Sequence, residues 1–572
     1  MENTFERLSI SDRKIIVAID FGTTYSGMAW AETQRHDRRT AITTWPISQT
    51  IRDGKTSEKV PTKLRHTIND IQWGFQVPPQ APAEEVFEWF KLDLDPSLRP
   101  STENRGTRYD AQKLITDYLS KLGEHLLYTL RLKLGEALVR NTPLDFILTV
   151  PAIWSDLAKS KTLEACQRAG GPFQNRPITL ISEPEAAAIY TLHGLDPHGL
   201  EVGDSFVICD AGGGTVDLIS YTITNLKPIL EIKEASPGSG ALCGSSFLNR
   251  RFETFLRSKL RNEEGFDDEI LAEAMERFEE QTKRHFTMAA LPNDTFRIPV
   301  PGLANNKALG IQRGSLLLKA QELQTIFEPV ILQIIQLVRD QITSSKTPIR
   351  AVLLVGGFGG STYLRERLRN SLGPNIQVMQ PPNAWLAVVN GAVMKGLSLS
   401  APAQLTHVKV EQRVARRHYG TEFGVLYDPS KHSALESIRW WDGLDGIYRV
   451  TVMNWFIQKG ETVSENEAIY HGYYVWKRVS AGRIQKLSLD IFVDGIDRPA
   501  TMLRDENLKL LCKVEADLSH IPDDQLTQRK GADGNVYYVL DCKLEAVYHS
   551  ASTSWTLIYK GQRYNTVKAE YV

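Results

Sequence analysis

The chain has 572 residues, more than one hydrophobic core can organise, so about three or four domain-sized units are expected. With 42% hydrophobic and 24% charged residues the composition is that of a globular protein, and a formal net charge of −1 gives no reason to expect a nucleic acid or an anionic membrane as partner. The N-terminus lacks the apolar core of a secretory signal, and no segment approaches the ~20 apolar residues of a spanning helix. The scattered cysteines form no CxxC pair, which argues against zinc and favours a cytoplasmic or nuclear setting.

The stretch IVAIDFGTTYSG, residues 16–27, predicts a buried strand that ends in an acid and a tight turn. Asp20 closes the strand, and Gly22, Thr23 and Thr24 follow it. A turn without bulky side chains exposes backbone N–H groups to phosphate oxygens, hydroxyls add donors, and a carboxylate can hold a metal ion. A plain hairpin is the alternative, because these residue types are common in turns and strands.

The next segments alternate between helix and strand. Residues 109–135 have apolar side chains at helical spacing, and 143–154 form a buried strand that ends at Pro151. Residues 155–170 begin with a Ser-Asp cap and close on glycine, as a helix does, and 178–192 predict a strand followed by an Ala-rich helix. This alternation is typical of sheets covered by helices.

A second copy of the opening pattern, FVICDAGGGTVDLISYT, occupies residues 206–222. An apolar strand again ends in an acid, Asp210, which lies 190 residues after Asp20. Three glycines and Thr215 follow, and then a second strand. Two similar strand–turn–strand units at this distance indicate a duplicated domain.

Helical patterns continue over 246–290 and 319–341, residues 349–372 predict a strand, a double-glycine turn and a helix, and 383–397 predict a helix of small residues. The composition then shifts, and residues 398–408 are interpreted as a linker. Beyond the linker, aromatic and β-branched residues alternate with polar ones, which predicts half-exposed antiparallel strands. The last domain is therefore expected to be mostly β.

Several of these motifs resemble a known family. AIDFGTTYSG, LISEPEAAAIY, CDAGGGTVD, VLLVGGFGG and NGAVMKG occur in the order of the actin-like ATPase motifs, and the set is most similar to the seventy-kilodalton heat-shock chaperones. TVPAIWSD, LCGSSFLNRRF and EQTKRHFT favour that branch over actin and the sugar kinases. The resemblance covers residues 14–397 and is specific because the motifs form an ordered set.

The resemblance implies an α/β fold, an actin-like ATPase of two lobes built as duplicated ribonuclease H-like domains, followed by a β-rich domain. The expected division is lobe I over 14–200, lobe II over 201–397, the linker over 398–408, and a degenerate substrate-binding-like domain over 409–572. The linker lacks the Leu-rich acidic sequence of the chaperones, and no helical lid pattern follows the β region. These departures resemble the divergent, lidless member-12 group and its fungal relatives.

The resemblance also implies a nucleotide site between the lobes. The residues expected to bind the nucleotide are Gly22, Thr23, Thr24, Tyr25, Gly212, Gly213, Gly214, Thr215, Gly244, Glu280, Lys283, Arg284, Thr287, Gly356 and Gly357. The expected metal-facing acids are Asp20, Asp210 and Asp217, and the expected catalytic residues are Lys91, Glu183, Asp210 and Thr215. The implied cofactors are ATP or ADP and Mg²⁺, with K⁺ left open as a further cation. Tyr363 is expected near the adenine, in place of the family's arginine.

A purely structural role is the alternative at several of these positions. The glycines can serve turn geometry alone, Glu183 can be a favourable acid at a helix N-terminus, and Lys91 can be a solvated lysine. Pro151 and Lys159 match positions that relay nucleotide state between domains in the family, although Pro151 can equally end a strand. The basic residues within 409–420 are interrupted by an acid and favour a solvated strand face over nucleic-acid binding.

The resulting hypothesis is an ATP-binding protein of the heat-shock-70 type, with weak Mg²⁺-dependent ATP hydrolysis and a chaperone-like role. Its β domain would bind unfolded or specific protein clients, and neither nucleic acid nor a membrane is expected as partner. A nucleotide-binding scaffold or sensor that does not hydrolyse ATP is the alternative. A small-molecule kinase of the same fold is a weaker alternative, because no substrate-binding motif for one is found.

Overall fold

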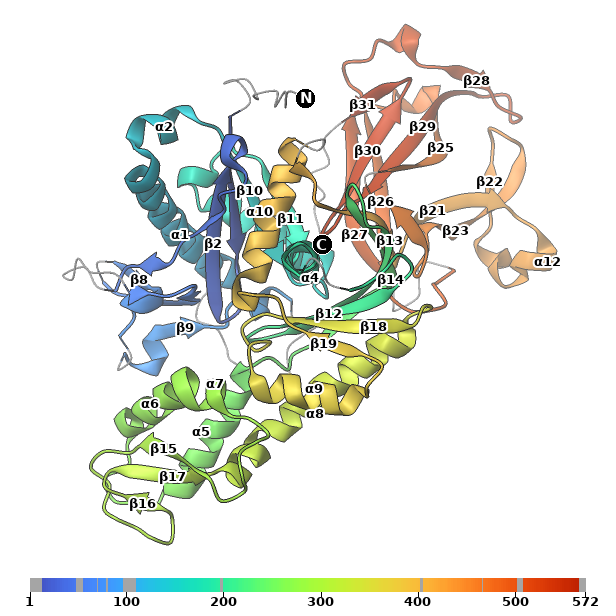
Figure 1. Ribbon diagram of the computed structural model, residues 1–572. Coiled ribbons are helices and arrows are strands. Elements are labelled where there is room, and N and C mark those ends of the chain that lie inside the picture. The colour runs from blue at the N-terminus through green and yellow to red at the C-terminus, as the bar shows by residue number, and fades with distance from the viewer. Residues whose placement is uncertain are drawn as a thin grey trace, which may run out of the picture. The chain divides into compact units, whose positions relative to one another are not determined.

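The computed structural model describes residues 13–47, 55–68, 70–78, 81–95, 110–195, 199–401, 405–465, 467–501 and 508–564. Over these ranges the chain forms two compact units that divide between Val410 and Glu411 (Figure 1). The first unit mixes helices and sheets, and the second consists mainly of strands. The prediction of an α/β region followed by a β-rich region is confirmed.

The first unit contains two large sheets. The strands of the first sheet lie in the order β11 (Ile178–Ser182), β10 (Leu144–Val150), β1 (Ile15–Asp20), β2 (Tyr25–Glu32) and β3 (Thr40–Ala41), and β6 (Val60–Pro61) also pairs with β2. β1 is antiparallel to β2 and parallel to β10. Every residue of β1 is buried, because helices cover both faces of the sheet, with α1 (Ala111–Leu134) and α10 (Ala387–Ser400) on opposite sides (Figure 1).

The second sheet repeats the arrangement of the first. Five of its strands follow the order β19 (Gln377–Met379), β18 (Ile349–Val355), β12 (Ser205–Ala211), β13 (Val216–Asn225) and β14 (Leu230–Ala241), and β20 (Val408–Val414) comes next to β14. β12 is antiparallel to β13 and parallel to β18, as β1 is to β2 and β10. We call the part built on the first sheet the first lobe and the part built on the second sheet the second lobe. The repeat is what the two copies of the motif predict.

The helices recur in the same positions of the two lobes. In the first lobe α1 precedes β10, α3 (Asp156–Arg168) lies between β10 and β11 in the sequence, and α4 (Glu183–Gly194) follows β11. In the second lobe α8 (Ala320–Ser344), α9 (Thr362–Leu372) and α10 take the same positions around β18 and β19. α3 begins as its sequence predicts, because the Ser155 side chain accepts a hydrogen bond from the backbone N–H of Ala158.

α4 and α10 lie between the two sheets and join the lobes. One buried cluster contains Ile16 of β1, Ile208 of β12, Ala187 of α4 and Ala392 of α10. Glycine allows the close approach of these elements, because a Cβ on Gly391 would overlap the backbone of α4. The small residues of α10 therefore serve helix packing as well as helix formation.

The segment over 246–290 is not one helical stretch. It divides into α5 (Ser246–Leu260), α6 (Asp268–Arg277), a π-helical turn over Phe278–Thr282, and α7 (Lys283–His285). α5 ends at Leu260, Gly265 has a φ of +86° in the turn that follows, and the Asp267 side chain caps the next helix by accepting from Ile270 N at 2.9 Å. Apolar spacing alone carries neither signal, so the sequence prediction was wrong here. A small sheet of β15 (Thr295–Pro299), β17 (Ser315–Lys319) and β16 (Ile311–Gln312) follows.

In the second lobe the segment between β14 and α8 contains α5, α6, α7 and the small sheet, and in the first lobe an insertion of short strands lies between β3 and α1. Its short strands are β4 (Thr44–Trp45), β5 (Lys55–Thr56), β6, β7 (Lys63–His66), β8 (Ile71–Trp73) and β9 (Val86–Glu88). α2 (Glu136–Asn141) follows α1 in the same lobe. The insertion matters for function because it carries Lys59 and Lys91.

The second unit consists of two antiparallel sheets. One has the order β22 (Trp440–Asp442), β23 (Ile447–Ile457), β21 (His418–Leu426), β26 (Lys486–Asp494) and β27 (Lys509–Asp517). The other has the order β25 (Ala468–Arg478), β29 (Val536–Tyr548), β30 (Thr553–Tyr559) and β31 (Gln562–Tyr564), with β28 (Gln528–Lys530) also paired to β29. Both contribute to one core, in which Val514 and Leu540 are fully buried. A single short helix, α12 (Pro429–His432), is described among these strands.

The proposed linker over 398–408 coincides only partly with irregular chain. α10 continues to Ser400, and β20 (Val408–Val414) carries the chain into the second unit, where it pairs with β24 (Thr462–Ser464). Residues 402–404 and the C-terminal residues 565–572 lie outside the described ranges. None of the helices in those ranges combines the length and the apolar character that crossing a membrane would require.

Candidate functional site

The two glycine turns predicted from the sequence meet each other directly. The turn between β1 and β2 comes from the first lobe, and the turn between β12 and β13 comes from the second. A Cβ on Gly213 would overlap the Thr24 hydroxyl, and a Cβ on Gly214 would lie 2.7 Å from the Thr23 methyl group. Neither glycine is among the residues with positive φ, so the close approach of the two turns, rather than backbone conformation, requires glycine here.

A cavity of about 330 Å³ opens beside this contact and lies between the lobes. Its walls come from both turns, from the region around α7, and from the segments that precede α9 and α10. The lining residues include Asp20, Gly22, Thr23, Thr24, Tyr25, Lys59, Glu183, Asp210, Gly212, Gly213, Gly214, Thr215, Glu279, Lys283, Arg284, Gly356, Gly357 and Trp385. Asp20 and Asp210 thus line the same cavity, although they are 190 positions apart in the sequence.

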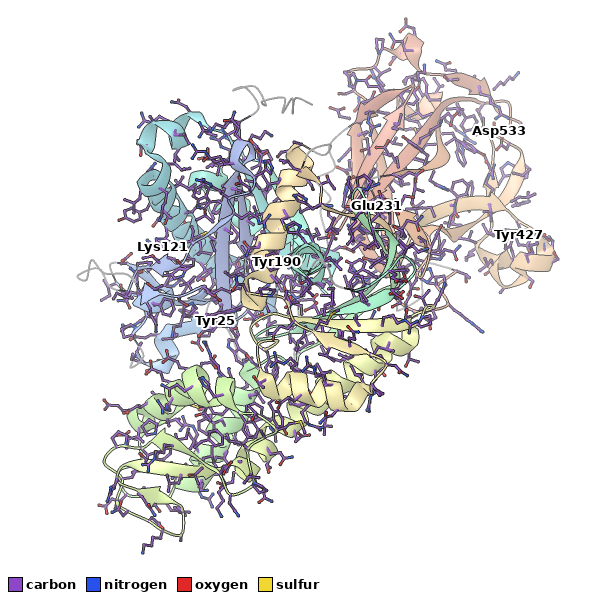
Figure 2. The ribbon with its side chains drawn as sticks, viewed as in Figure 1. Tyr25, Lys121, Tyr190, Glu231, Tyr427 and Asp533 are labelled. Carbon is purple, nitrogen blue, oxygen red and sulfur yellow. The ribbon has the colours of Figure 1, made fainter. Side chains whose placement is uncertain are left out.

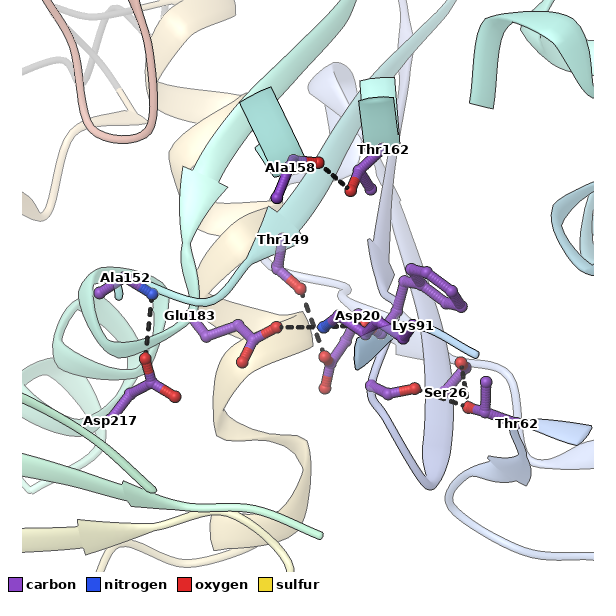
Figure 3. Close-up of polar contacts among 12 residues, drawn as sticks. Asp20, Ser26, Thr62, Lys91, Thr149, Ala152, Ala158, Thr162, Glu183 and Asp217 are labelled. Carbon is purple, nitrogen blue, oxygen red and sulfur yellow. Dashed lines mark hydrogen bonds and ion pairs between the residues drawn. The ribbon is translucent and has the colours of Figure 1, made fainter. Parts of the chain in front are cut away.

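Both oxygens of the Asp20 carboxylate have partners. Lys59 Nζ lies 2.5 Å from Asp20 Oδ2. The Thr149 hydroxyl donates to Asp20 Oδ1 at 3.3 Å (Figure 3). Lys59 reaches this position because β6 pairs with β2, which places Val60 opposite Ser26. The carboxylate at the end of β1 is therefore already compensated by a cation from the same lobe.

Asp210 occupies the equivalent position at the end of β12 but has a different environment. It is 6% exposed, and no hydrogen bond or ion pair from the described residues reaches its carboxylate. Burial raises its pKa well above the ordinary value, and the nearby carboxylates of Glu183, Asp217 and Asp20 raise the pKa further. A buried carboxylate of this kind favours the approach of a cation or a proton.

Lys91 and Glu183 form a buried ion pair at the floor of the site. Lys91 is 1% exposed, its Nζ lies 2.8 Å from Glu183 Oε1, and it also donates to the carbonyl oxygen of Phe21 (Figure 3). The ammonium group lies 5.1 Å from the centre of the Trp154 ring. Lys91 is thus not the solvated lysine that the sequence alternative describes. Burial raises the pKa of Glu183 to about 7, and Lys91 offsets only part of that effect.

Asp217 turns away from the cavity. It accepts hydrogen bonds from the backbone N–H groups of Ala152 and Ile153, at 3.1 and 3.4 Å (Figure 3). These groups follow Pro151 at the end of β10, so Asp217 ties the second lobe to the first. Among the described residues, no three carboxylate, imidazole or thiolate groups lie close enough together to hold a metal ion unaided. A metal ion here would need oxygens from a ligand or from water.

The π-helical turn changes which acidic residue faces the cavity. A regular helix would place Glu280 on the face of Lys283 and Arg284, but the wider turn over Phe278–Thr282 shifts the register, and Glu279 lines the cavity instead. Glu279 forms an ion pair with Lys283. Glu280 pairs with Lys55 at 3.5 Å, and both side chains are about half exposed. Glu279, and not the expected Glu280, therefore faces the cavity.

Thr287 and Tyr363 lie away from this cavity. α7 ends at His285, so Thr287 leaves the helix face on which the sequence places it, and it lines a separate cavity of about 250 Å³. Tyr363 lines the same second cavity, where its ring stacks on Phe286 with centroids 4.6 Å apart, and its hydroxyl bonds to Glu328. Helix register and core packing thus remove both residues from the positions that the sequence predicts.

Trp385 provides the aromatic surface of the main cavity. Its ring meets Tyr25 edge-on, with centroids 5.6 Å apart, and Tyr25 lies at the start of β2 (Figure 2). The Arg284 guanidinium lies 5.5 Å from the Trp385 ring. Gly357 leaves room beside this ring, because its Cβ would come 3.1 Å from Trp385 Nε1. The sequence signal that could have identified Trp385 is its place just before a helix of small residues, but Trp385 belongs to none of the recognised motifs.

The remaining expected residues support the second turn. Gly244 N donates to the carbonyl oxygen of Gly214 at 3.2 Å, and a Cβ on Gly244 would overlap that turn. Gly356 has a φ of +85°, and its Cβ would lie 2.5 Å from Asp210 Oδ1. Lys159 is buried on α3, outside the cavity lining. Lys59, Glu279 and Trp385 are among the cavity residues that the sequence interpretation missed.

Two family models match successive parts of the chain. The family model described as Hsp70 protein matches residues 95–412, more than half of the chain, so the chain belongs to the Hsp70 family. A second model, described as a domain of unknown function (DUF8568), matches residues 413–571.

Three curated proteins illustrate the relationship. Heat shock 70 kDa protein 12A of Mus musculus is 25% identical over 483 residues, which cover 67% of this chain and 69% of that protein. The Homo sapiens protein of the same name is 24% identical over 483 residues, with the same coverage. Heat shock 70 kDa protein 12B of Homo sapiens is 24% identical over 474 residues, covering 67% of this chain and 68% of that protein. The resemblance to the member-12 group is confirmed as distant homology.

Proposed function

We propose that the cavity binds ATP and ADP between the two lobes. The observation that carries the proposal is the direct contact of two glycine turns, residues 21–24 and 212–215, at one end of the cavity. Each turn follows a strand and contains glycine, whose backbone N–H group a phosphate oxygen can approach closely. The cavity volume of about 330 Å³ is in the range of small-molecule sites.

The other walls of the cavity fit the remaining parts of a nucleotide. Trp385 and Arg284 offer flat surfaces for a base, and Gly357 keeps the approach to the Trp385 ring open. The Glu279 carboxylate, oriented by Lys283, is a hydrogen-bond acceptor for ribose hydroxyls. The proposed binding set is therefore the predicted one without Thr287, with Glu279 in place of Glu280 and Trp385 in place of Tyr363.

We also propose slow ATP hydrolysis at the inner end of the cavity. Mg²⁺, when bound with phosphate oxygens and water, would neutralise phosphate charge, and Asp210 is the carboxylate that fits it because no described residue pairs with it. Glu183, with a pKa of about 7, can accept a proton from water at neutral pH. Lys91 fixes the position of Glu183, and Thr215 lies beside the phosphate turn.

A non-hydrolysing nucleotide-binding scaffold is the second candidate. It is favoured by one observation, the engagement of both Asp20 oxygens by Lys59 and Thr149, which reduces the carboxylate oxygen available to a metal ion. In this case nucleotide would hold the lobes together without turnover. The two candidates share the binding site and differ in chemistry alone.

For the second unit we propose a role in binding protein clients. The proposed division remains lobe I over 14–200, lobe II over 201–397, a linker over 398–408 and a degenerate substrate-binding-like domain over 409–572. The repeated strand order of the two large sheets in the first unit supports the division into two lobes. The edge position of β25 in its sheet, where an extended peptide could add a strand, supports client binding by the second unit.

The experiment is titration calorimetry of the full chain with ADP and with ATP, followed by single-turnover release of phosphate from ATP. We expect saturable binding of both nucleotides, with mutual competition. Binding without phosphate release would favour the scaffold. The absence of binding by either nucleotide, in the presence and absence of Mg²⁺, would contradict the proposed site.

A further inference from the structure

The ammonium group of Lys59 is an unexpected feature of the proposed phosphate end of the cavity. The Lys59 side chain is 7% exposed and pairs with Asp20 at 2.5 Å. Its stem runs along Gly27, whose Cβ would lie only 3.2 Å from Lys59 Cγ. Because Gly27 pairs with Asp20 across β1 and β2, the missing side chain at Gly27 opens the path to the carboxylate. The pairing of β6 with β2 and the space left by Gly27 therefore fix the position of the Lys59 ammonium group.

We propose that Lys59 supplies, from the first lobe, the positive charge that compensates the nucleotide phosphates, so that ADP and ATP bind with little dependence on Mg²⁺. This inference rests on the proposed nucleotide site. It assigns to Lys59 a binding role, and it separates nucleotide affinity from any need for metal in hydrolysis.

The hydrogen-bonding capacity of the ammonium supports this role. A lysine ammonium has three N–H donors, and Asp20 accepts one of them. Lys59 lines the cavity together with the glycine turns, so its remaining donors can reach a ligand there. A hydrogen bond between an ammonium group and a phosphate oxygen is charge-assisted and stronger than a neutral one.

The state of Asp20 supports the second half of the inference. A carboxylate that accepts from Lys59 and from Thr149 has both oxygens engaged before a metal ion arrives. A divalent cation at this position would have to displace the ammonium, which repels it. Metal binding is thereby directed to the second lobe, where Asp210 has no partner among the described residues.

The test is calorimetric titration of the full chain with ADP, once in Mg²⁺ and once in EDTA. For the unmodified chain we expect the two Kd values to agree within about tenfold, the factor that corresponds to 1.4 kcal/mol. A loss of about tenfold or more in EDTA would overturn the inference while leaving the proposed function intact. If ADP binds in neither condition, the proposed function itself fails.

Two substitutions and a matched control sharpen the result. Lys59→Met should weaken ADP binding in EDTA by about tenfold or more, because it removes a charge-assisted hydrogen bond. Lys63→Met is the control, since Lys63 pairs with Glu88 at 3.9 Å, outside the cavity lining, and we expect no change in Kd. Equal behaviour of the two variants would overturn the role of Lys59.

Asp20→Asn keeps the test decisive if Lys59→Met does not fold. It leaves Lys59 in place and removes the carboxylate that competes with phosphate for the ammonium. We therefore expect ADP affinity in EDTA to stay equal or to rise. If Asp20 instead served as a metal ligand, affinity would fall in Mg²⁺ and not in EDTA, and that result would overturn the inference.

Discussion

The turns that end β1 and β12 occupy equivalent positions in two repeated lobes, yet their carboxylates are in different states. Asp20 is paired with Lys59 and Thr149. Asp210, at the end of the equivalent strand, has no partner among the described residues, and burial raises its pKa. The shared topology therefore places the two acids symmetrically, while their electrostatic environments differ.

The difference originates outside the repeated elements. Lys59 and Lys91 both belong to the insertion between β3 and α1, whereas the corresponding segment of the second lobe, between β14 and α8, carries Lys283 and Arg284. Duplication thus supplies the two phosphate turns, and the insertion of the first lobe supplies the ammonium group that pairs with Asp20. A site between duplicated lobes can become asymmetric without any change in its sheets.

The largest effect is expected where the two turns touch. Gly213→Val should abolish ADP binding, because its Cβ alone already overlaps the Thr24 hydroxyl and would force the turns apart. Titration calorimetry measures the loss. Gly194→Val is the control, since nothing lies within 4 Å of a Cβ on Gly194. Retained ADP affinity in a folded Gly213→Val variant would show that contact between the turns is not needed for binding.

The second prediction compares the rate of phosphate release in variants of the two carboxylates. Asp210→Asn should lower single-turnover phosphate release by about 100-fold, the usual effect of removing one preorganised electrostatic group. Asp20→Asn should lower it less, because Lys59 already compensates that charge. An equal loss of phosphate release in the two variants would contradict the proposed difference between Asp20 and Asp210.

The third prediction concerns the stability of the buried pair from the insertion. Lys91→Met leaves Glu183 buried without its cation, and such changes lower the free energy of unfolding by about 3 kcal/mol. Lys113→Met, which removes an ion pair on an exposed helix face, should cost less than about 0.5 kcal/mol. Chemical denaturation of both variants gives the two values. A neutral Lys91→Met would mean that Glu183 is protonated or hydrated in the folded protein.

The smallest effect is a dependence of stability on pH. The pKa of Glu183 is about 7 in the folded protein and about 4.5 as a free side chain, so the folded state binds a proton more tightly than the unfolded state. The stabilisation is complete below pH 4.5 and is lost as the pH rises through 7. We expect the free energy of unfolding to fall by about 1–2 kcal/mol across this window, and the fall to be smaller in Glu183→Gln. Denaturation midpoints at several pH values measure it, and identical profiles for the two proteins would contradict the assignment.

The parts of the site that could be predicted are those encoded locally. Asp20, Asp210 and the glycines lie in short strand–turn–strand motifs, and the structure brings them to one cavity. Lys59 escaped prediction because its position depends on pairing between β6 and β2, which no local pattern records. Glu279 escaped because one π-helical turn shifts the helix face by a residue.

The fold shows the same distinction between local and long-range information. Alternation of strands and helices was readable over 109–192, where caps and apolar spacing agree. The break within 246–290 was not, because Gly265 and the Asp267 cap interrupt a continuous amphipathic pattern. The burial of Lys91 depends on Phe21 and Glu183, which are distant from it in the sequence.

The position of α10 has a consequence for how the chain acquires its structure during synthesis. α10 is encoded at the end of the first unit but packs against β1, β2 and β10, which are encoded at its beginning. The ribosome must therefore add roughly 200 further residues after α4 before α10 can cover its face of the first sheet. At ordinary elongation rates this is a delay on the order of 10–40 s. Over that interval the apolar surface of β1, β2 and β10 that α10 will cover is exposed in the nascent chain, so the first lobe depends on the rest of its own chain, or on another protein, to shield it.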